Sequence, residues 1–287
     1  TVTQASAAAG RASRLLSRGT VEVEPITPFV DKEKCTKCGL CAKACPYGAI
    51  VVREIGRTHA SLVEAACKGC GTCVAECNVR ALDQRGFTNE QIIAQIEAAL
   101  RKDAENKILA FCCNWCSYAG ADLAGTSRFE YPTNIRIIRV MCTGRMDPTF
   151  LLEALRMGSD GVLIAGCHPG DCHYQKGNYM MEKRFDYIQK AVKSIGIEPE
   201  RVRLEWVSAS EGAKFAALAR EMAQQIKQLG PSPFRLKQIP RKAEATIDAF
   251  KSQRLRWVVG RSQIKVEIEE EKYRQAVDSI MQVEIER

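Results

Sequence analysis

Apolar and polar positions alternate in a regular way between residues 106 and 230. Four short apolar runs stand out there: KILAFC from Lys107, IRIIRVM from Ile135, GVLIAG from Gly161 and VRLEWV from Val202. Each run is followed by a longer stretch with the apolar spacing of an amphipathic helix. Because strands that alternate with helices form parallel sheets with crossover helices, we predict an α/β domain with a four-stranded parallel sheet.

Several helix boundaries in this domain can also be predicted. Asp147 followed by Pro148 is typical of an N-cap and the first position of a helix. A helix is expected over about residues 182–194, after the third strand. Ser208 and Glu211 have the spacing of a capping box, which predicts that the last helix of the domain begins there.

The segments that flank this domain have simpler patterns. Residues 1–30 are expected to form an Ala-rich helix, ending at about residue 19, and then an extended linker with two prolines. Residues 86–105 are expected to form a connecting helix, because Thr88 and Gln91 have the spacing of a capping box. Residues 231–287 are interpreted as a basic, proline-broken linker and a helical extension, charged at its end, which we interpret as an interaction arm.

The chain of 287 residues contains 14 cysteines, and eight of them fall within residues 31–85. They form two runs, CTKCGLCAKACP and CKGCGTCVAECN, each with the spacing C-x2-C-x2-C-x3-C of a ferredoxin with two 4Fe-4S clusters. In such runs the fourth cysteine binds the other cluster. The predicted ligands of the first cluster are Cys35, Cys38, Cys41 and Cys77. Those of the second are Cys67, Cys70, Cys73 and Cys45.

A pair of structural zinc sites is the alternative for these cysteines. Zinc sites use two C-x2-C pairs separated by a longer spacer, whereas here four cysteines fall within eleven residues, twice. Strand-like pieces at 49–52 and 61–63 flank a turn at Gly56, as expected of a small α+β two-cluster ferredoxin module. One departure is Asn78, which stands where the first run has Pro46; this change removes no ligand.

The other six cysteines follow the apolar runs of the α/β domain. They are Cys112, Cys113, Cys116, Cys142, Cys167 and Cys172. Ligands of open parallel sheets bind at the carboxyl ends of the strands, where these thiols are expected. We therefore predict a third, smaller iron–sulfur centre, most simply a 2Fe-2S cluster held by four thiolates.

Which four cysteines bind this third cluster stays open. Adjacent strand residues point to opposite faces, so Cys112 is excluded and the four ligands are expected among Cys113, Cys116, Cys142, Cys167 and Cys172. His168 and His173 are candidates for Rieske-type ligation, although hydrogen bonding is the preferred role. Trp115 and Tyr118 are expected to belong to the core or to shield the cluster from water.

Three alternatives to a third cluster remain. The six cysteines could be buried free thiols, which are common in protein cores. Cys113 and Cys116 form a C-x-x-C motif, which predicts a thiol–disulfide redox enzyme. The domain could also be a docking platform whose cysteines are incidental.

Charge and composition narrow the class of protein. The net charge is +8, but Lys and Arg are scattered and no basic stripe with stacking aromatic residues occurs, so nucleic-acid binding is not expected. No apolar run is long enough to span a bilayer and no signal peptide is evident. Because clusters need reduced thiols, an anaerobic cytoplasm is the expected location, with membrane association only through partners.

Four stretches of the sequence resemble a known family. They are FCCNWCSYAGADLAG from Phe111, MCTGRMDP from Met141, GCHPGDCHY from Gly166 and LEWVSASEG from Leu204. They resemble the delta subunit of methylviologen-reducing hydrogenases, which carries a 2Fe-2S cluster and often has leucine at the position of Cys112. The first helix and the ferredoxin runs resemble the carboxyl-terminal part of the A subunit of heterodisulfide reductase, whose flavin domain ends in a similar Ala-rich helix.

The resemblance covers about residues 1–230 and implies an electron-transfer subunit. In that family the delta subunit passes electrons between a hydrogenase or formate dehydrogenase and a flavin subunit, where electron pairs bifurcate toward ferredoxin and a disulfide-reducing subunit. A relative occurs in a quinone-interacting oxidoreductase complex. The FAD domain is absent here, so FAD is expected only on a partner chain or on a missing N-terminal region. The chain is expected to do no bond chemistry of its own.

Overall fold

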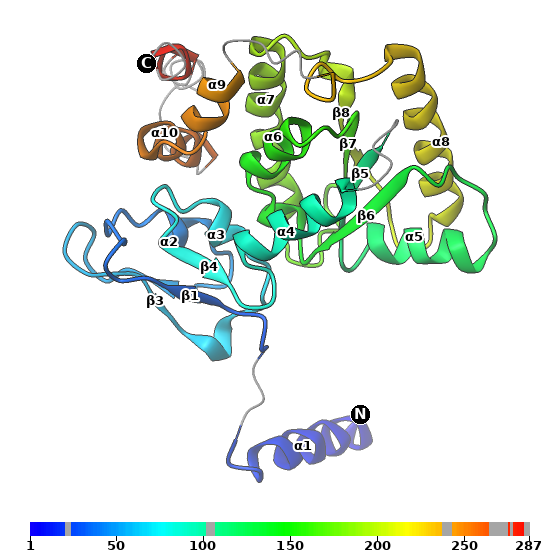
Figure 1. The fold of residues 1–287 in the computed structure, drawn as a ribbon. Helices are drawn as coiled ribbons and strands as arrows, with labels where there is room; N and C mark the ends of the chain where they lie inside the picture. The colour runs from blue at the N-terminus through cyan, green and yellow to red at the C-terminus, as the bar shows by residue number, and fades with distance from the viewer. Residues whose placement is uncertain (21–23, 102–106, 237–242, 264–274, 276–277, 284–287) are drawn as a thin grey trace.

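The computed structural model of the chain describes residues 1–20, 24–101, 107–236, 243–263, 275 and 278–283. Helix α1 (Val2–Leu16) confirms the predicted first helix and lies apart from the rest of the chain (Figure 1). The ferredoxin segment and the α/β domain lie side by side, and helices from the C-terminal segment lie next to both (Figure 1).

Two short antiparallel ladders form the ferredoxin domain. Strand β1 (Pro28–Val30) pairs with β4 (Leu82–Gln84), and β2 (Ile50–Val51) pairs with β3 (Ser61–Leu62). The second ladder and the positive φ of 82° at Gly56 confirm the predicted strands and turn. Strand β1 lies in the segment that was predicted to be a linker. Pro28 is tolerated there because it occupies the first position of a short strand.

Two short helices follow the first cysteines of each run in the same way. Helix α2 (Leu40–Ala44) follows Gly39 and helix α3 (Thr72–Ala75) follows Gly71; both glycines are left-handed, with φ of 78° and 76°. At Gly71 a side chain is also excluded by space, since a Cβ would lie 2.6 Å from Cδ of Arg145. A 3-10 turn, η1 (Glu64–Ala66), precedes the second run.

Helix α4 (Asn89–Leu100) connects the two domains and confirms the predicted capping box. The Thr88 hydroxyl accepts a hydrogen bond from the Gln91 N–H, and the Gln91 side chain accepts one from the Thr88 N–H. Residues 102–106, at the end of the predicted connecting segment, lie outside the described part of the chain.

The α/β domain has the predicted four-stranded parallel sheet. Its strands are β5 (Ile108–Cys113), β6 (Ile135–Val140), β7 (Gly161–Gly166) and β8 (Val202–Trp206), in the order β6-β5-β7-β8. Because the chain runs from β5 outward to β6 and then crosses to β7 on the other side, the strand order reverses between β5 and β7. Ligands of such sheets bind outside the carboxyl ends of the strands at this point.

Helices cover both faces of the sheet (Figure 1). On one face α5 (Ser117–Thr126) and α8 (Gly212–Leu229) pack on the side chains of Ile108, Ala110 and Cys112. On the other face α4, α6 (Pro148–Arg156) and α7 (Gly177–Ser194) pack on Leu109 and Phe111. Two 3-10 turns, η2 (Thr143–Arg145) and η3 (Pro199–Arg201), complete the domain.

The observed helix boundaries agree in part with those predicted from the sequence. Asp147 caps α6 with Pro148 in its first turn, as predicted. Helix α7 begins at Gly177, earlier than expected. The capping box predicted at Ser208 is only half formed: Glu211 accepts a hydrogen bond from the Ser208 N–H, but the Ser208 hydroxyl pairs with Ser210 and α8 begins at Gly212. The Glu211 carboxylate also lies 2.7 Å from Nε2 of His168.

The segment after residue 230 packs on the core in part, although its first residues were predicted to be a linker. Phe234 is buried in the core on the face of the sheet that α4, α6 and α7 cover, which we call the main core. Helices α9 (Ala243–Ala249) and α10 (Gln253–Gln263) add Phe250 and Leu255 to this core. Most of the charged second helix lies outside the described residues; those described, 275 and 278–283, are helical. None of the helices in the described ranges has the length and hydropathy to cross a membrane.

The capping box of α4 supports a stability prediction. Replacing Thr88 with Ala should lower the free energy of unfolding by about 1 kcal/mol, because the Gln91 N–H loses its acceptor. Thr88→Asn, which keeps a side-chain acceptor, is the control and should be nearly neutral. Urea unfolding of the anaerobic protein followed by circular dichroism measures both; equal losses in the two variants would contradict the role of the cap.

Candidate iron–sulfur sites

The first group of thiols surrounds one cavity of the ferredoxin domain. Cys35, Cys38, Cys41 and Cys77, the four ligands predicted for the first cluster, all line it, together with Gly39 and Asn78. Burial, and then repulsion from the other three sulfurs, raises the pKa of Cys41 to about 12. Four sulfurs around one cavity are a donor set that suits an iron–sulfur cluster, whose positive iron ions stabilise thiolates.

The second group surrounds another cavity. Cys45, Cys67, Cys70 and Cys73 line it, together with Tyr47. Burial is the main cause of the raised pKa values of Cys67, Cys70 and Cys73. The two cavities thus bring together the crossed sets expected from the spacing, three cysteines from one run and the fourth from the other. The residues present therefore fit one 4Fe-4S cluster in each cavity.

These two groups of thiols share one patch of core. Cys41 and Cys77 of the first group and Cys73 of the second belong to the same hydrophobic cluster. Cys41 is also among the groups whose charge raises the pKa of Cys73. The thiols of the two cavities are therefore direct neighbours.

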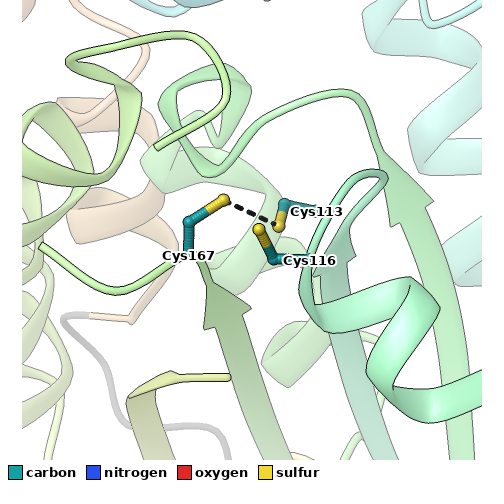
Figure 2. Close-up of side chains that lie close together, drawn as sticks. All are labelled: Cys113, Cys116 and Cys167. Atoms are coloured by element: carbon teal, nitrogen blue, oxygen red, sulfur yellow. Dashed lines mark hydrogen bonds between the residues drawn. The ribbon is translucent and has the colours of Figure 1, made fainter. Parts of the chain in front are cut away.

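A third group lies at the carboxyl ends of β5 and β7 (Figure 2). The sulfurs of Cys113, at the end of β5, and Cys167, after β7, lie 3.6 Å apart. With Cys116 they form a group whose sulfur atoms all lie within 4.8 Å of one another. The reversal of strand order between β5 and β7 is what brings them together, because both strands end at the same edge with no strand between them.

Two further thiols extend this group. The sulfurs of Cys142, after β6, and Cys172 lie 4.0 Å apart, and Cys172 also interacts with Cys167. Gly177 makes room for Cys142, since a Cβ at residue 177 would lie 2.1 Å from its sulfur. The five thiols considered for the third cluster are therefore contiguous, which leaves open which four would bind it.

Cys112 lies on the other side of the sheet. It is fully buried in the core beneath α5 and α8, whereas Cys113 belongs to the cluster of thiols at the strand ends. Burial raises the pKa of Cys112 well above its ordinary value. The alternation of side chains along β5 therefore separates the two neighbouring cysteines.

Hydrogen bonds distribute the protons of the third group unevenly. Hydrogen bonds with the thiols of Cys116 and Cys167, and one donated by the Ser117 N–H, lower the pKa of Cys113 strongly. The contact with Cys113 raises the pKa of Cys167. Ser117 also accepts from the Cys113 N–H and donates to the Ala165 carbonyl, which fastens the end of β5 to β7.

The histidines and aromatic residues near these thiols have other partners. His168 Nε2 lies 2.7 Å from the Glu211 carboxylate, rather than bonding to a thiol or to the backbone. His173 stacks on Trp115 with ring centroids 4.0 Å apart, and Trp115 donates to the hydroxyl of Tyr174. Trp115 and Tyr118 are 43% and 39% exposed, so they are not core residues. Tyr174, which is buried, was not recognised in the sequence.

The second and third groups of thiols meet across the domain boundary. Cys70 belongs to the same buried cluster as Cys113, Cys142, Cys167 and Cys172. Tyr47 packs against it; burial raises the pKa of Tyr47 to about 12, and charges on Cys70 and on thiols of the third group add to the effect. The two groups of sulfurs are therefore in contact through buried side chains.

Buried charges hold the two domains together, and sequence reasoning did not identify them. Arg184 on α7 binds the Glu76 carboxylate at 2.6 Å, and both side chains are about 2% exposed or less. The same guanidinium donates to the carbonyls of Gly144 and Met146. Arg145, also fully buried, donates to the Phe87 carbonyl and the Asn89 side chain. Arginines in amphipathic helices are usually solvated, so their spacing gives no signal of this role.

The fold and the three groups of thiols together define an iron–sulfur protein that joins a ferredoxin domain to an α/β domain with a four-stranded parallel sheet. Comparison with known proteins gives the family. Residues 108–230 match the family described as methyl-viologen-reducing hydrogenase, delta subunit. Residues 28–51 and 64–80 match 4Fe-4S binding domains.

The iron-sulfur D subunit of a hydrogenase from Methanococcus voltae is 54% identical over 127 residues, which are 44% of this chain and 88% of that protein. The corresponding protein of Archaeoglobus profundus is 49% identical over 135 residues, 47% of this chain and 98% of that protein. The chain therefore belongs to the family of hydrogenase delta subunits.

A second relationship covers more of the chain. The A subunit of the ferredoxin:CoB-CoM heterodisulfide reductase of Methanosarcina mazei is 44% identical over 237 residues, which are 82% of this chain. The chain spans only 30% of the length of that relative. Both parts of the expected resemblance, to the heterodisulfide reductase protein and to the hydrogenase delta subunit, are confirmed.

The buried pair at the domain boundary leads to a mutational prediction. Arg184→Met should destabilise the protein by about 3–5 kcal/mol, because Glu76 would remain buried without its partner. In the double variant Arg184→Met/Glu76→Gln the loss should be smaller, since no lone charge is left. Thermal unfolding of the anaerobic protein by circular dichroism measures both; a double variant as unstable as the sum of the two single variants would refute the pairing.

Proposed function

We propose that the chain is an electron-transfer subunit that relays electrons through two 4Fe-4S clusters and one 2Fe-2S cluster. The proposed ligands of the first 4Fe-4S cluster are Cys35, Cys38, Cys41 and Cys77, and those of the second are Cys67, Cys70, Cys73 and Cys45. Four of Cys113, Cys116, Cys142, Cys167 and Cys172 hold the 2Fe-2S cluster. Such clusters accept and release single electrons, at potentials that the surrounding protein adjusts.

The observation that supports this proposal best is the continuity of buried sulfur. The first and second groups share a core cluster through Cys41, Cys73 and Cys77, and the second and third share another through Cys70 and Cys142. Electrons would thus pass from one group to the next in the order first, second, third, or in reverse. Buried free cysteines would have no reason to form one chain across a domain boundary.

The protein residues have separate roles in this relay. The left-handed glycines Gly39 and Gly71 turn the backbone so that each run can wrap around its cavity. Ser117 fixes the end of β5, and Gly177 admits Cys142 to the third group. Tyr174, which is buried among the thiols of the third group, limits the access of water, and Trp115 donates a hydrogen bond to its hydroxyl.

The proposed partners follow from the relatives. One relative is named as the iron-sulfur protein of a hydrogenase and another as part of a heterodisulfide reductase, which suggests a hydrogenase on one side. A formate dehydrogenase in the same place is implied only by the family resemblance. On the other side we propose heterodisulfide reductase-like flavin and disulfide-reducing subunits, with FAD on a partner chain or a further segment and with electron bifurcation at that flavin. A quinone-interacting oxidoreductase complex is the alternative assembly. We place the complex in the cytoplasm of an anaerobic cell.

A thiol–disulfide redox enzyme is the second candidate function. Two observations favour it: hydrogen bonds lower the pKa of Cys113, as in a reactive thiolate, and Cys116 beside it is partly exposed. The five contiguous sulfurs favour a cluster instead, because a disulfide enzyme needs only two of them. Free thiols at Cys113 and Cys116 that react with an alkylating reagent in the holoprotein would support the enzyme.

Iron analysis tests the relay directly. The anaerobically reconstituted chain should contain about ten irons, as expected for two 4Fe-4S clusters and one 2Fe-2S cluster. After reduction it should show an electron paramagnetic resonance signal of a 2Fe-2S centre. A content of about eight irons without that signal would remove the third cluster, and colourless protein loaded with zinc would remove all three.

Two adjacent cysteines form a matched test of the third site. Cys113→Ala should abolish the 2Fe-2S signal and lower the iron content by about two, if Cys113 is one of the four ligands. Cys112→Ala, which removes a thiol of the same strand from the opposite face, should leave the signal and the iron content unchanged. The proposed location of the site would be wrong if the Cys112 variant lost the signal and the Cys113 variant kept it.

A further inference from the structure

One arginine of the C-terminal segment reaches a proposed cluster ligand of the ferredoxin domain. Arg256, on α10, donates from Nε and Nη2 to the carbonyl of Cys77 at 3.2 and 3.0 Å. Nη2 also donates to the carbonyl of Ala75 at 3.2 Å. These carbonyls lie at and just after the end of α3, where the helix leaves its last acceptors unsatisfied.

The arginine is placed there by its own helix. Leu255, next to it, is fully buried in the main core, so α10 cannot turn Arg256 toward solvent without exposing that side chain. Further along α10, Gly260 packs against the ferredoxin helices: a Cβ at this position would lie 3.1 Å from the Glu76 carboxylate and 3.3 Å from Leu40. The helix therefore presses closely on the segment that contains Cys77.

The guanidinium of Arg256 is buried, and an ion pair compensates its charge at one edge. Its side chain is 6% exposed, and Nη1 binds the Asp147 carboxylate at 2.8 Å. The opposite edge of the guanidinium faces the Cys77 peptide, so the positive charge lies against the backbone of a proposed cluster ligand. By contrast Arg254, two residues earlier, is exposed at the rim of a hollow beside Cys38, where solvent screens its charge.

We propose that Arg256 is a positioning residue for the first 4Fe-4S site, which holds the Cys77 backbone in place and raises the reduction potential of the cluster bound there. The inference rests on the proposed function for the identity of the cluster. Reduction adds one electron, and hence one negative charge, to the site. A nearby buried cation stabilises the reduced form more than the oxidised form, so the potential rises.

This role assigns a function to the C-terminal segment. Without α10 the carbonyls of Ala75 and Cys77 would lose the guanidinium donors that Arg256 supplies, and the first site would lose a buried positive charge. The segment thus acts on the first cluster, at the end of the proposed relay opposite the third group of thiols. Arg256 would therefore give the two 4Fe-4S sites different reduction potentials, although their ligand runs have the same spacing.

Redox titration of the anaerobically reconstituted full chain tests the proposal. Dithionite with mediators supplies the electrons, and electron paramagnetic resonance follows each cluster. The signal of the first site is identified as the one that Cys35→Ala removes. Arg256→Gln should lower the midpoint potential of that signal, whereas Arg256→Lys, which keeps the charge, should restore most of the original value. The potentials of the other two clusters should move less.

Asp147→Asn gives a test of opposite sign. Asparagine still caps α6, but the loss of the carboxylate removes the ion-pair partner of Arg256 and its negative charge, so the potential of the first site should rise. Looser packing would not shift the two variants in opposite directions. The proposal is overturned if Arg256→Gln leaves the potential unchanged or if both variants shift it the same way. Should Arg256→Gln fail to fold, Asp147→Asn decides alone, and no rise would overturn the proposal.

The redox test of Arg256 does not depend on how many clusters the chain binds. A chain with only the iron of two 4Fe-4S clusters and no 2Fe-2S signal would refute the three-cluster relay, yet the potential of the first site could still be measured in every variant. Conversely, the role of Arg256 alone would be refuted if the chain contained all the expected iron but neither Arg256→Gln nor Asp147→Asn changed the potential of the first site.

Discussion

Desolvation of grouped thiols is the constraint on which the structure depends. Burial and mutual repulsion raise the pKa of Cys41 to about 12, and burial also raises the pKa values of Cys70 and Cys73 in the second group. A protein gains nothing in stability from placing so many sulfurs together unless positive ions stabilise their ionised forms. The fold can therefore be understood as a scaffold that holds three sulfur-lined sites close together and away from water.

The scaffold combines two ways of gathering ligands. In the ferredoxin domain the cysteines lie close in the sequence, and left-handed glycines wrap each run around its cavity. In the α/β domain the candidate ligands come from strand ends and loops far apart in the sequence, and the reversal of strand order between β5 and β7 brings them together. Because Cys70 and Cys142 lie in one buried cluster, the domain boundary is part of the proposed electron path, and the ion pair of Arg184 with Glu76 keeps it closed.

Particular residues show how far sequence reasoning reached at this site. The separation of Cys112 from Cys113 could be inferred, since side chains alternate along any strand. The partners of His168 and His173 could not, because Glu211 and Trp115 come from loops whose paths no local pattern predicts. Arg256 is 179 positions from Cys77 in the sequence, and nothing in the spacing of α10 distinguishes it from a solvated arginine.

The sequence by itself determined the grouping of the eight ferredoxin cysteines, the parallel sheet of four strands and the edge at which the other thiols gather. Each of these depends on local spacing or on the period of apolar residues, which fold much the same way in any context. Only the tertiary structure decided that the second and third groups of thiols touch, that Phe234 and α10 pack on the core, and that buried arginines join the two domains. These features depend on which surfaces meet, and the packing of distant segments sets them rather than any repeating pattern.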